Sequence, residues 1–442
     1  MRKRLGLLAL TLAGMVAQPS AVHADDLSTL LTQATDTLLP NLTHAAHFEV
    51  ANAAENINLV TGINQAIAGQ FATVPLGSPA GGFTSSIDSS TGVGSRNSTT
   101  FGPQFAERAL TTGKRKFAVG VQFLHASYDN LNGTDIRDGS LTIQLLHEDD
   151  GTPGRLDPAR FFEGDVMTNQ LKLDLKLDTA LVVGTFGVTD HFDLGVVLPY
   201  VRADLTIDVD KTTQPLATRT FSPTTHEFAP GPIYTGSSSA AGSASGIGDI
   251  VLRGKYNFLD PSKGSGLALA LDVRVPTGDE KNFLGTGVTQ AKLYVIGSSH
   301  VGWFSSHINL GYTASTGTSS VVTDFPDEIN YVAGFEAECH PRLTFAADLI
   351  GRVLLDAQVT KQTTATFLAF DPDLDGGLGA VYATTLPQLE VQRQDQSLLQ
   401  GALGLKINPG GKWVISVGAL VPISHNGLTS SVAGFVGFDY SF

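Results

Sequence analysis

The sequence is poor in residues that cross-link a chain and in positive charge. It contains a single cysteine, Cys339, so no intramolecular disulfide can form and stability must come from the fold itself. Charged residues make up only 16% of the chain, and the formal net charge is −14. Nucleic-acid binding depends on a basic surface, so we expect no nucleic acid as a partner.

Long hydrophobic runs are also missing. A transmembrane helix needs about 20 apolar residues, and the longest run, residues 5–16, is too short. This run follows the basic residues 2–4 and precedes a small-residue site at residues 21–24, which is the pattern of a secretory signal peptide. We therefore predict a signal peptide over residues 1–24 and an exported chain without a helical membrane anchor.

Sequence signatures of enzymes are scarce as well. The chain has no GxSxG, HExxH or Walker motif. His300 and His307 flank a predicted turn, with Ser305 and Ser306 between them. A catalytic Ser–His pair needs a third group that orients the base, and the turn supplies none. We predict that the protein is not an enzyme and keep a barrel-borne hydrolase as the weakest alternative.

What the sequence does contain is regular alternation of apolar and polar residues. Leucine alternates with polar, mostly charged residues over 170–178, and apolar or aromatic residues alternate with Gly, Asp and Ser over 436–442. A period of two predicts β-strands with one apolar face. The last strand ends on Phe442, as closing strands of bacterial outer-membrane β-barrels do. We therefore expect the barrel-assembly machinery as a partner through this strand.

Twelve strands are predicted between residues 116 and 442. They cover residues 116–128, 167–188, 191–208, 247–258, 266–276, 288–300, 304–315, 328–339, 342–356, 397–408, 412–423 and 430–442. Short turns alternate with longer connections, of which 129–166, 209–246 and 357–396 are long. Short periplasmic turns, long outer loops and an even strand count are typical of outer-membrane barrels.

The predicted fold is therefore all-β, a transmembrane antiparallel β-barrel of about 12 strands over residues 116–442. We expect it in the outer membrane of a Gram-negative-type bacterium, in contact with the membrane lipid. Aromatic residues gather near the predicted strand ends, including Trp303, Trp413 and Tyr440 on the turn side and Tyr128 and Tyr312 toward the other. We interpret them as two aromatic girdles; ordinary sheet packing is the alternative.

Residues 25–115 lack this alternation. Apolar residues recur at helical spacing from Leu27 to Leu38, and a second helix is predicted over residues 53–71. A segment rich in Gly and Ser follows, over residues 75–83. This N-terminal segment either plugs the lumen, lies in the periplasm or is partly disordered, and we favour a plug.

In a membrane barrel the polar face of each strand lines the lumen. The residues predicted to line it carry both signs of charge, which can pair between neighbouring strands. They are Lys172, Asp174, Lys176, Arg202, Asp204, Asp249, Arg253, Lys255, Asp272, Arg274, Glu336, Glu338, Arg342, Asp348 and Arg352. Twelve strands give a bore between the filled barrels of about 8 strands and the open porins of about 16. A pore for small solutes and an internal ladder of salt bridges both fit, and the two can coexist.

One long connection contains a weak candidate for a calcium site. Asp371, Asp373 and Asp375, followed by Gly376, match the first half of a calcium-binding loop. The twelfth position is Tyr382 instead of the bidentate glutamate, so this is not an EF-hand. Weak calcium binding in an outer loop and an ordinary acidic, solvated loop both remain open. We expect no other cofactor.

Two sequence blocks resemble a known family. Residues 245–256 contain Gly246-Ile247-Gly248-Asp249, and residues 270–279 end in Pro276-Thr277-Gly278-Asp279. With the aromatic C-terminal strand, these GxGD and PTGD elements resemble the outer-membrane family described as "Putative MetA-pathway of phenol degradation", over roughly residues 165–442. The resemblance implies a porin-like channel for aromatic or other hydrophobic compounds. From the residues alone, Gly and Asp at these strand ends predict structural turns at the outer rim rather than a ligand site.

The functional hypothesis is passive, channel-type uptake of small, hydrophobic or aromatic compounds. The main alternative is a closed barrel with a structural role or a role in surface interactions through its long loops. An open pore should conduct ions, whereas a closed structural barrel should not.

Overall fold

The computed structural model describes residues 26–36, 53–71, 75, 85–87, 94–96, 100–146, 165–215, 235–259, 264–322, 324–371 and 380–442. The predicted signal peptide lies outside these residues, and so do Asp373, Asp375 and the side chain of Asp371 from the candidate calcium site. Among the helices of the described part, none is long and apolar enough to cross a membrane.

Within the described residues, twelve antiparallel strands form a closed barrel, as predicted. In ring order they are β3 (Phe117–Tyr128), β7 (Asp165–Gly187), β8 (Phe192–Pro215), β10 (Ile250–Leu259), β11 (Ser265–Val275), β12 (Thr289–Val301), β13 (Phe304–Thr316), β14 (Glu328–His340), β15 (Leu343–Asp371), β16 (Ala380–Ile407), β17 (Trp413–Pro422) and β19 (Ala433–Ser441). The ring closes where β19 pairs with β3, from Gly434 opposite His125 to Ser441 opposite Ala118. The first and last strands are therefore neighbours, which leaves the barrel without open edges.

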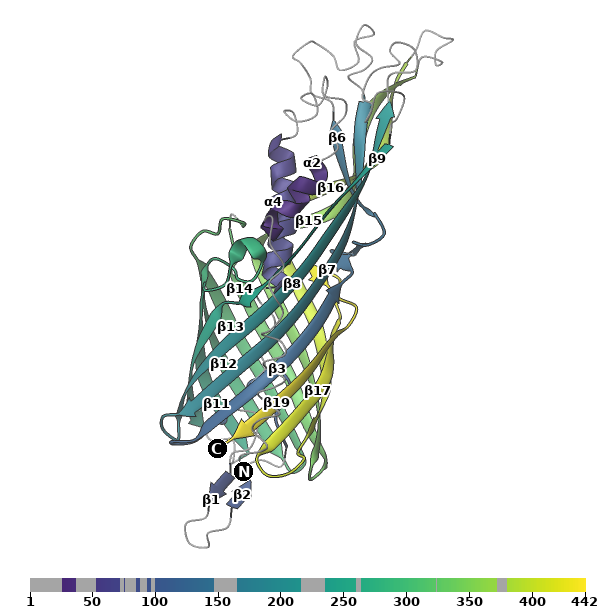
Figure 1. The fold of residues 1–442 in the computed structure, drawn as a ribbon. Coiled ribbons are helices and arrows are strands. Elements are labelled where there is room, and N and C mark those ends of the chain that lie inside the picture. Colours follow the sequence, from purple (N-terminus) through teal and green to yellow (C-terminus); the bar gives the residue numbers. More distant parts are fainter. Residues whose placement is uncertain are drawn as a thin grey trace, which may run out of the picture.

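Four strands, β7, β8, β15 and β16, continue beyond the barrel mouth as a long projection (Figure 1). Two further strands widen it: β6 (Leu141–Leu146) pairs with β7, and β9 (Thr235–Ile247) pairs with β8. The predicted loops at 209–246 and 357–396 are thus wrong in part, because residues 209–215, 235–246, 357–371 and 380–396 are strand. Outside the membrane the outward face of a strand meets water, so these stretches are rich in Ser, Thr and Gln. They therefore lack the regular alternation of apolar and polar residues by which a lipid-facing strand is recognised.

The predicted helices fill the inner face of the projection (Figure 1). They are the 3-10 helix η1 (Leu27–Thr29), α2 (Leu30–Asp36) and α4 (Ala53–Phe71). Their apolar residues form one core with the leucines of β7, which are almost fully buried. The helices approach the sheet closely at two glycines, because a Cβ on Gly242 would lie 2.8 Å from Leu27 and one on Gly62 would overlap Thr360.

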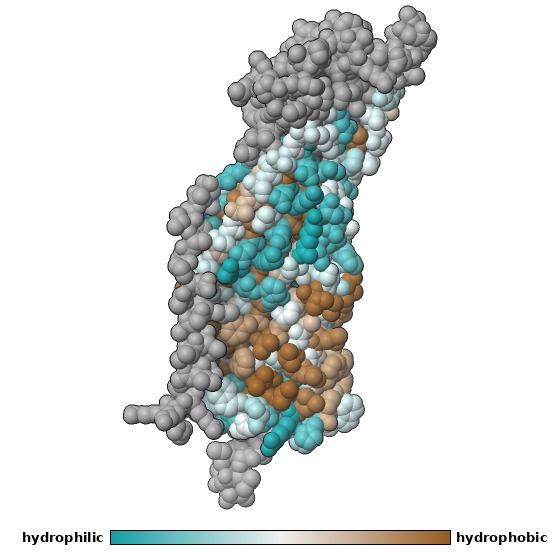
Figure 2. Space-filling model, turned by 45° about the vertical axis from the view of Figure 1, so that its right-hand side comes forward, coloured by the Kyte–Doolittle hydropathy of each residue, from teal (hydrophilic) through white to brown (hydrophobic). Residues whose placement is uncertain are grey.

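A band of outward-facing apolar residues surrounds the lower part of the barrel, and Figure 2 shows it below a hydrophilic upper half. Exposed members of the band include Leu194, Leu252, Leu271, Leu293, Leu310, Leu403, Val417 and Phe438. Aromatic rings contact one another at the turn side, as in Trp413–Tyr440 and Tyr440–Phe442, each with centroids 4.7 Å apart. Tyr128 is not part of an outer girdle, because it is buried inside the barrel against Phe71 of α4.

Short elements complete the described chain. The strands β1 (Ser85–Ile87) and β2 (Gly94–Arg96) pair with each other, and β4 (Asn130–Leu131) pairs with both β5 (Thr134–Asp135) and β18 (Leu428–Thr429). The 3-10 helix η5 (Glu280–Asn282) lies in the connection between β11 and β12.

Candidate functional site in the barrel lumen

Residues 100–112, called the lumen segment below, lie inside the barrel. Its Gly102 and Pro103 interrupt any strand, so its backbone amides need other partners. Side chains of the inner wall supply them. The amides of Phe101, Gly102, Phe105, Glu107 and Ala109 donate hydrogen bonds to Thr344, Glu336, Asp348, Asn309 and Ser298, respectively. These partners lie in the halves of β12–β15 next to the short turns, so the segment occupies the periplasmic half of the lumen.

Glu336 of β14 is the main anchor of the lumen segment. Its carboxylate is fully buried and accepts hydrogen bonds from the Arg108 guanidinium, with Nε at 2.9 Å, and from the Gly102 amide. A further hydrogen bond of 2.9 Å joins it to His307 Nε2. A buried carboxylate is tolerated when it is paired and hydrogen-bonded, which is the case here. Glu336 therefore ties the segment to β13 and β14.

His307 also connects Glu336 to a serine. A hydrogen bond of 2.9 Å joins His307 Nδ1 to Ser298 Oγ, which gives a Ser–His–Glu chain. A third orienting group for His307 does exist, but it comes from β14 and not from the turn, and the serine is Ser298 of β12. However, Ser298 Oγ accepts the Ala109 amide, Arg108 engages Glu336, and Ser298 lines neither cavity described below. The arrangement holds the lumen segment and leaves no room for a substrate at Ser298.

Asp348 of β15 fixes the middle of the lumen segment. Its Oδ2 accepts the amides of Phe105, at 2.6 Å, and Ala106, at 3.2 Å. The opposite residue on β14 is Gly334. A Cβ there would overlap Asp348 Oδ1 and lie 3.1 Å from Ala106 Cβ, so the site requires a residue without a side chain.

Glu107 joins the lumen segment to the other side of the barrel. Its carboxylate pairs with Arg253 and Lys255, both on β10. Arg253 is shared, because Asp272 of β11 accepts from its Nε and Nη2, each at 2.7 Å. Asn309 contacts Glu107 twice, by accepting its amide and donating to its carbonyl.

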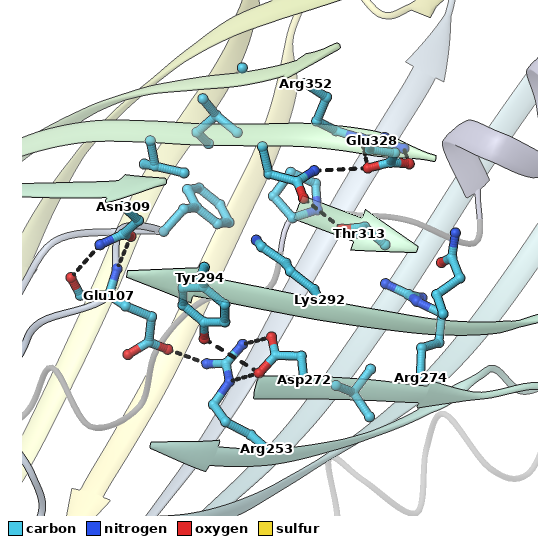
Figure 3. A pocket seen from close by; sticks show the side chains of 18 residues that line it. Glu107, Arg253, Asp272, Arg274, Lys292, Tyr294, Asn309, Thr313, Glu328 and Arg352 are labelled. Atoms are coloured by element: carbon cyan, nitrogen blue, oxygen red, sulfur yellow. Dashed lines mark hydrogen bonds and ion pairs between the residues drawn. The ribbon is translucent and has the colours of Figure 1, made fainter. Parts of the chain in front are cut away.

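Directly beyond Glu107 and Phe105 lies a cavity of about 130 Å³, called the lumen cavity (Figure 3). Four cationic side chains and three carboxylates line it: Arg253, Arg274, Lys292 and Arg352, with Glu107, Asp272 and Glu328. Apolar wall is contributed by Phe105, Tyr294, Val251, Val332 and Ile350. The cavity is therefore amphipathic, with a charged belt and apolar patches.

A second cavity of about 50 Å³ lies toward the projection. Pro75, Ile350 and Arg352 line both cavities, so the two adjoin. Its wall carries less charge, because Arg352 is the one charged residue among the described residues that line it, and it includes Leu124, Tyr128, Leu398, Leu420 and Leu428. A solute from the outer side would meet a wall with little charge first and the charged side chains afterwards.

The strand register explains how these charges come together. Arg253 pairs in register with Asp272, Asp272 with Lys292, Lys292 with Thr313, and Thr313 with Glu328. These five residues form one continuous row across β10–β14, here called the charged row. Each is the polar member of an alternating strand, so closure of the barrel turns the whole row inward.

Nine of the fifteen residues predicted to line the lumen face inward. Asp249, Lys255, Asp272, Glu336 and Asp348 are buried, Arg253 and Arg352 form ion pairs in the lumen, and Arg274 lines the lumen cavity. Glu338 is half-buried on the same face of β14 as Glu336, closer to the periplasmic end. Arg342 is exposed in the turn between β14 and β15, outside the strands, so its prediction was wrong.

Five other predictions were wrong because they assumed that the apolar face meets lipid. Lys176 and Arg202 are exposed and Lys172, Asp174 and Asp204 half-buried on the outside of the projection. There they pair locally, as in Lys172 with Asp210 at 2.7 Å. The leucines between them point inward onto the helices. Above the membrane, the outer face of a strand meets water and the inner face meets protein, which inverts the expected orientation.

The GxGD and PTGD motifs build a turn at the outer rim. Asp249 accepts the Gly278 amide at 3.0 Å and both the amide and hydroxyl of Thr286, at 2.7 and 2.8 Å. A Cβ on Gly278 would lie 2.5 Å from the Leu284 carbonyl oxygen. The two motifs thus fold the connection between β11 and β12 against β10, in agreement with a structural role.

Several residues of the site were missed at the sequence level. Glu107 and Arg108 lie in a segment without periodicity, so no pattern indicated that they enter the lumen. Lys292 and Glu328 could have been found, because both occupy polar positions of alternating strands.

Comparisons with known proteins identify a family for this chain. The family described as "Putative MetA-pathway of phenol degradation" matches residues 166–421. No curated protein sequence matches closely enough to count as a relative. Among solved structures, the COG4313 outer membrane channel from Pseudomonas putida F1 is 10% identical, with a TM-score of 0.44 and coverage of 76% of this chain and 98% of that one.

Two further solved structures have still lower TM-scores. A Pseudomonas aeruginosa FadL homologue is 10% identical, with a TM-score of 0.30 and coverage of 74% of this chain and 89% of that one. The Ralstonia pickettii toluene transporter TbuX is 10% identical, with a TM-score of 0.25 and coverage of 75% and 90%. Because these scores are low, membership rests on the family match, which spans more than half of the chain. The chain is an outer-membrane β-barrel that belongs to the family described as "Putative MetA-pathway of phenol degradation".

Proposed function

We propose that the protein is a channel for passive uptake of small, hydrophobic or aromatic compounds across the outer membrane. The observation that carries this proposal is the pair of adjoining cavities inside the barrel, with one charged side chain among the described residues of the wall toward the outside and seven in the wall deeper in. The toluene transporter TbuX and the "CymD monoaromatic hydrocarbon channel" share the general barrel architecture, which is consistent with it.

The lumen segment closes the path on the periplasmic side. It is buried over almost its whole length and held by Glu336, Asp348 and the Glu107–Arg253 pair. Transport through the barrel therefore requires this segment to move or to leave a narrow gap. Its anchors are ion pairs and hydrogen bonds, which can exchange partners with water when the segment shifts.

Catalysis is not part of the proposal. The Ser298–His307–Glu336 chain is the arrangement on which a hydrolase would rest, and its serine is covered by the Ala109 amide. If the hydrolase alternative were true, a Ser298→Ala variant should abolish any ester hydrolysis. Weak calcium binding by Asp371, Asp373 and Asp375 stays a separate prediction.

The barrel-assembly machinery remains the proposed partner for insertion. Strand β19 closes the ring, and the Phe442 amide donates to the Phe117 carbonyl at 2.7 Å. The Phe442 ring packs on Phe117 and Tyr440. Removal of Phe442 should lower the yield of folded barrel in cells, measured by heat-modifiable gel mobility.

The function is tested by uptake and conductance together. We expect cells that carry the protein to take up phenol or toluene at limiting concentration faster than cells without it. In planar bilayers, a version lacking residues 25–112 should conduct ions better than the mature chain, because the lumen segment is gone. Unchanged uptake, with no conductance from either version although the barrel is folded, would favour the closed structural barrel.

A further inference from the structure

The three carboxylates that line the lumen cavity are all engaged by partners other than Lys292. Glu107 pairs with Arg253 and Lys255. Asp272 receives two hydrogen bonds from Arg253, and Glu328 receives two from Arg352 and one from Asn330. The negative charge of the cavity wall is therefore already matched by these neighbours.

Lys292 stands in the middle of the charged row, between Asp272 and Thr313. Among the described residues, its ammonium group forms neither an ion pair nor a hydrogen bond, and no dashed line reaches it in Figure 3. It lies over the Tyr294 ring, with Nζ 4.8 Å from the centroid. The ammonium group thus points into the cavity with only a cation–π contact.

Such an ammonium group is a site for an anion. A partly buried charge without an ionic partner costs free energy, and a cation–π contact recovers only about 0.5–2 kcal/mol of it. With four cations and three carboxylates on the wall, the cavity has a formal charge of +1. A single negative charge on a bound solute would balance it.

The volume of the cavity and its apolar wall limit which anionic solutes can bind. A cavity of roughly 150 Å³ accommodates benzene, and the lumen cavity of about 130 Å³ together with the adjoining cavity of about 50 Å³ provides somewhat more space than that. Phe105, Val332 and Ile350 provide apolar surface for a ring, while Lys292 provides the charge. A single ring with one acidic group matches both features, whereas a long acyl chain exceeds the volume.

We propose that the lumen cavity binds a small aromatic monocarboxylate, whose carboxylate pairs with Lys292 and whose ring contacts Phe105, Val332 and Ile350. Access from the outside rests on the proposed function, whereas binding itself does not. The cavity would make the channel favour aromatic acids over neutral rings of the same size.

The test is calorimetric titration of the full-length mature protein in detergent with benzoate, benzyl alcohol and benzylamine. These probes share one ring and differ in charge. We expect benzoate to bind most tightly and benzylamine most weakly. Lys292→Met should weaken benzoate binding by roughly tenfold or more, the effect of losing a hydrogen bond to a charged group. It should leave benzyl alcohol unchanged.

Two control variants separate the site from general charge. Lys292→Arg keeps the cation and should retain most of the benzoate affinity. Lys172→Met removes a lysine on the outside of the projection and should have no effect. Folding of each variant is checked by heat-modifiable gel mobility, and the order of the three probes on the unaltered protein needs no variant.

Equal binding of the three probes, no benzoate binding, or an unchanged benzoate affinity of folded Lys292→Met would each overturn the proposal. Failure of the channel function is distinguishable from these outcomes. A protein that binds benzoate through Lys292 but does not increase uptake of any aromatic compound would retain the site and lose the transport proposal.

Discussion

Glu336 shows how much of the closed lumen depends on one residue. It has no exposed surface and joins Arg108, Gly102 and His307. Glu336→Gln removes the charge that balances Arg108, and loss of one partner of a buried pair costs about 3–5 kcal/mol. We expect the lumen segment to detach more often. Single-channel recordings should show higher conductance, and the amides of the segment should exchange hydrogen faster.

The matched control is Glu338→Gln. Glu338 lies two residues away on the same face of β14 and is half-buried near the periplasmic end. It should leave both conductance and exchange close to those of the unaltered protein. An equal rise in conductance for both variants would mean that general loss of lumen charge, and not release of the segment, is responsible.

A substitution at Gly334 would displace the lumen segment by steric overlap, without changing any charge. In Gly334→Ala the new methyl group would overlap Asp348 and press on Ala106, so Asp348 can no longer hold the amides of Phe105 and Ala106. We expect increased conductance with a barrel that still shows heat-modifiable mobility. Gly434→Ala is the control, because a Cβ there meets nothing within 4 Å. A silent Gly334→Ala would contradict the position of the segment.

At the scale of single residues, the sequence predicts which side chains of a strand face the lumen, but it does not predict which side chains they contact there. The alternation of apolar and polar residues correctly predicted that Arg253, Asp272 and Glu336 face inward, because each is a polar residue of a strand that crosses the apolar band. It could not show that Glu107 and Arg108 would meet them. Those two residues reach the lumen through a segment held by side-chain contacts between residues far apart in the chain, which leave no local pattern.

At the scale of elements, the helices and the projection form one unit. Ile63 of α4 is almost fully buried in the core that includes the leucines of β7. Ile63→Ala should weaken the docking of α4 by about 2–5 kcal/mol. We expect faster hydrogen exchange in α4 and no change in the exchange of β11–β13. Thr61→Ala, at a half-buried position of the same helix, should change neither. Slowed or unchanged exchange in Ile63→Ala would mean that α4 does not depend on this core.

The projection also shows why element bounds were predictable in the membrane and not above it. Where strands cross the apolar band, their bounds were predicted to within a few residues, because the face in contact with lipid must be apolar and the face toward the lumen is polar. Strand β9 consists mostly of Ser, Ala and Gly, so its sequence gave no alternation to detect. A hydrophobic period of two residues identifies a strand, but it does not show whether the apolar face of that strand contacts lipid or the protein interior.

At the scale of the whole molecule, the apolar band sets the depth of the barrel in the membrane (Figure 2). Lys172 and Asp204 then lie above the membrane on the outer side, and Arg342 lies in a periplasmic turn. In a Cys339→Ser background, we expect Lys172→Cys and Asp204→Cys to react with a membrane-impermeant maleimide on intact cells. Arg342→Cys should react only after the outer membrane is permeabilised.

This experiment separates two geometries that the alternation of residues 170–178 allows equally. If the leucines of β7 faced lipid, Lys172 would line the lumen, and Lys172→Cys would be shielded or would alter conductance once labelled. In the fold described above the leucines contact α2 and α4, so a label at residue 172 remains in water outside the barrel. Its attachment should leave conductance unchanged. A drop in conductance on labelling would place residues 170–178 of β7 within the membrane and their charged side chains in the lumen.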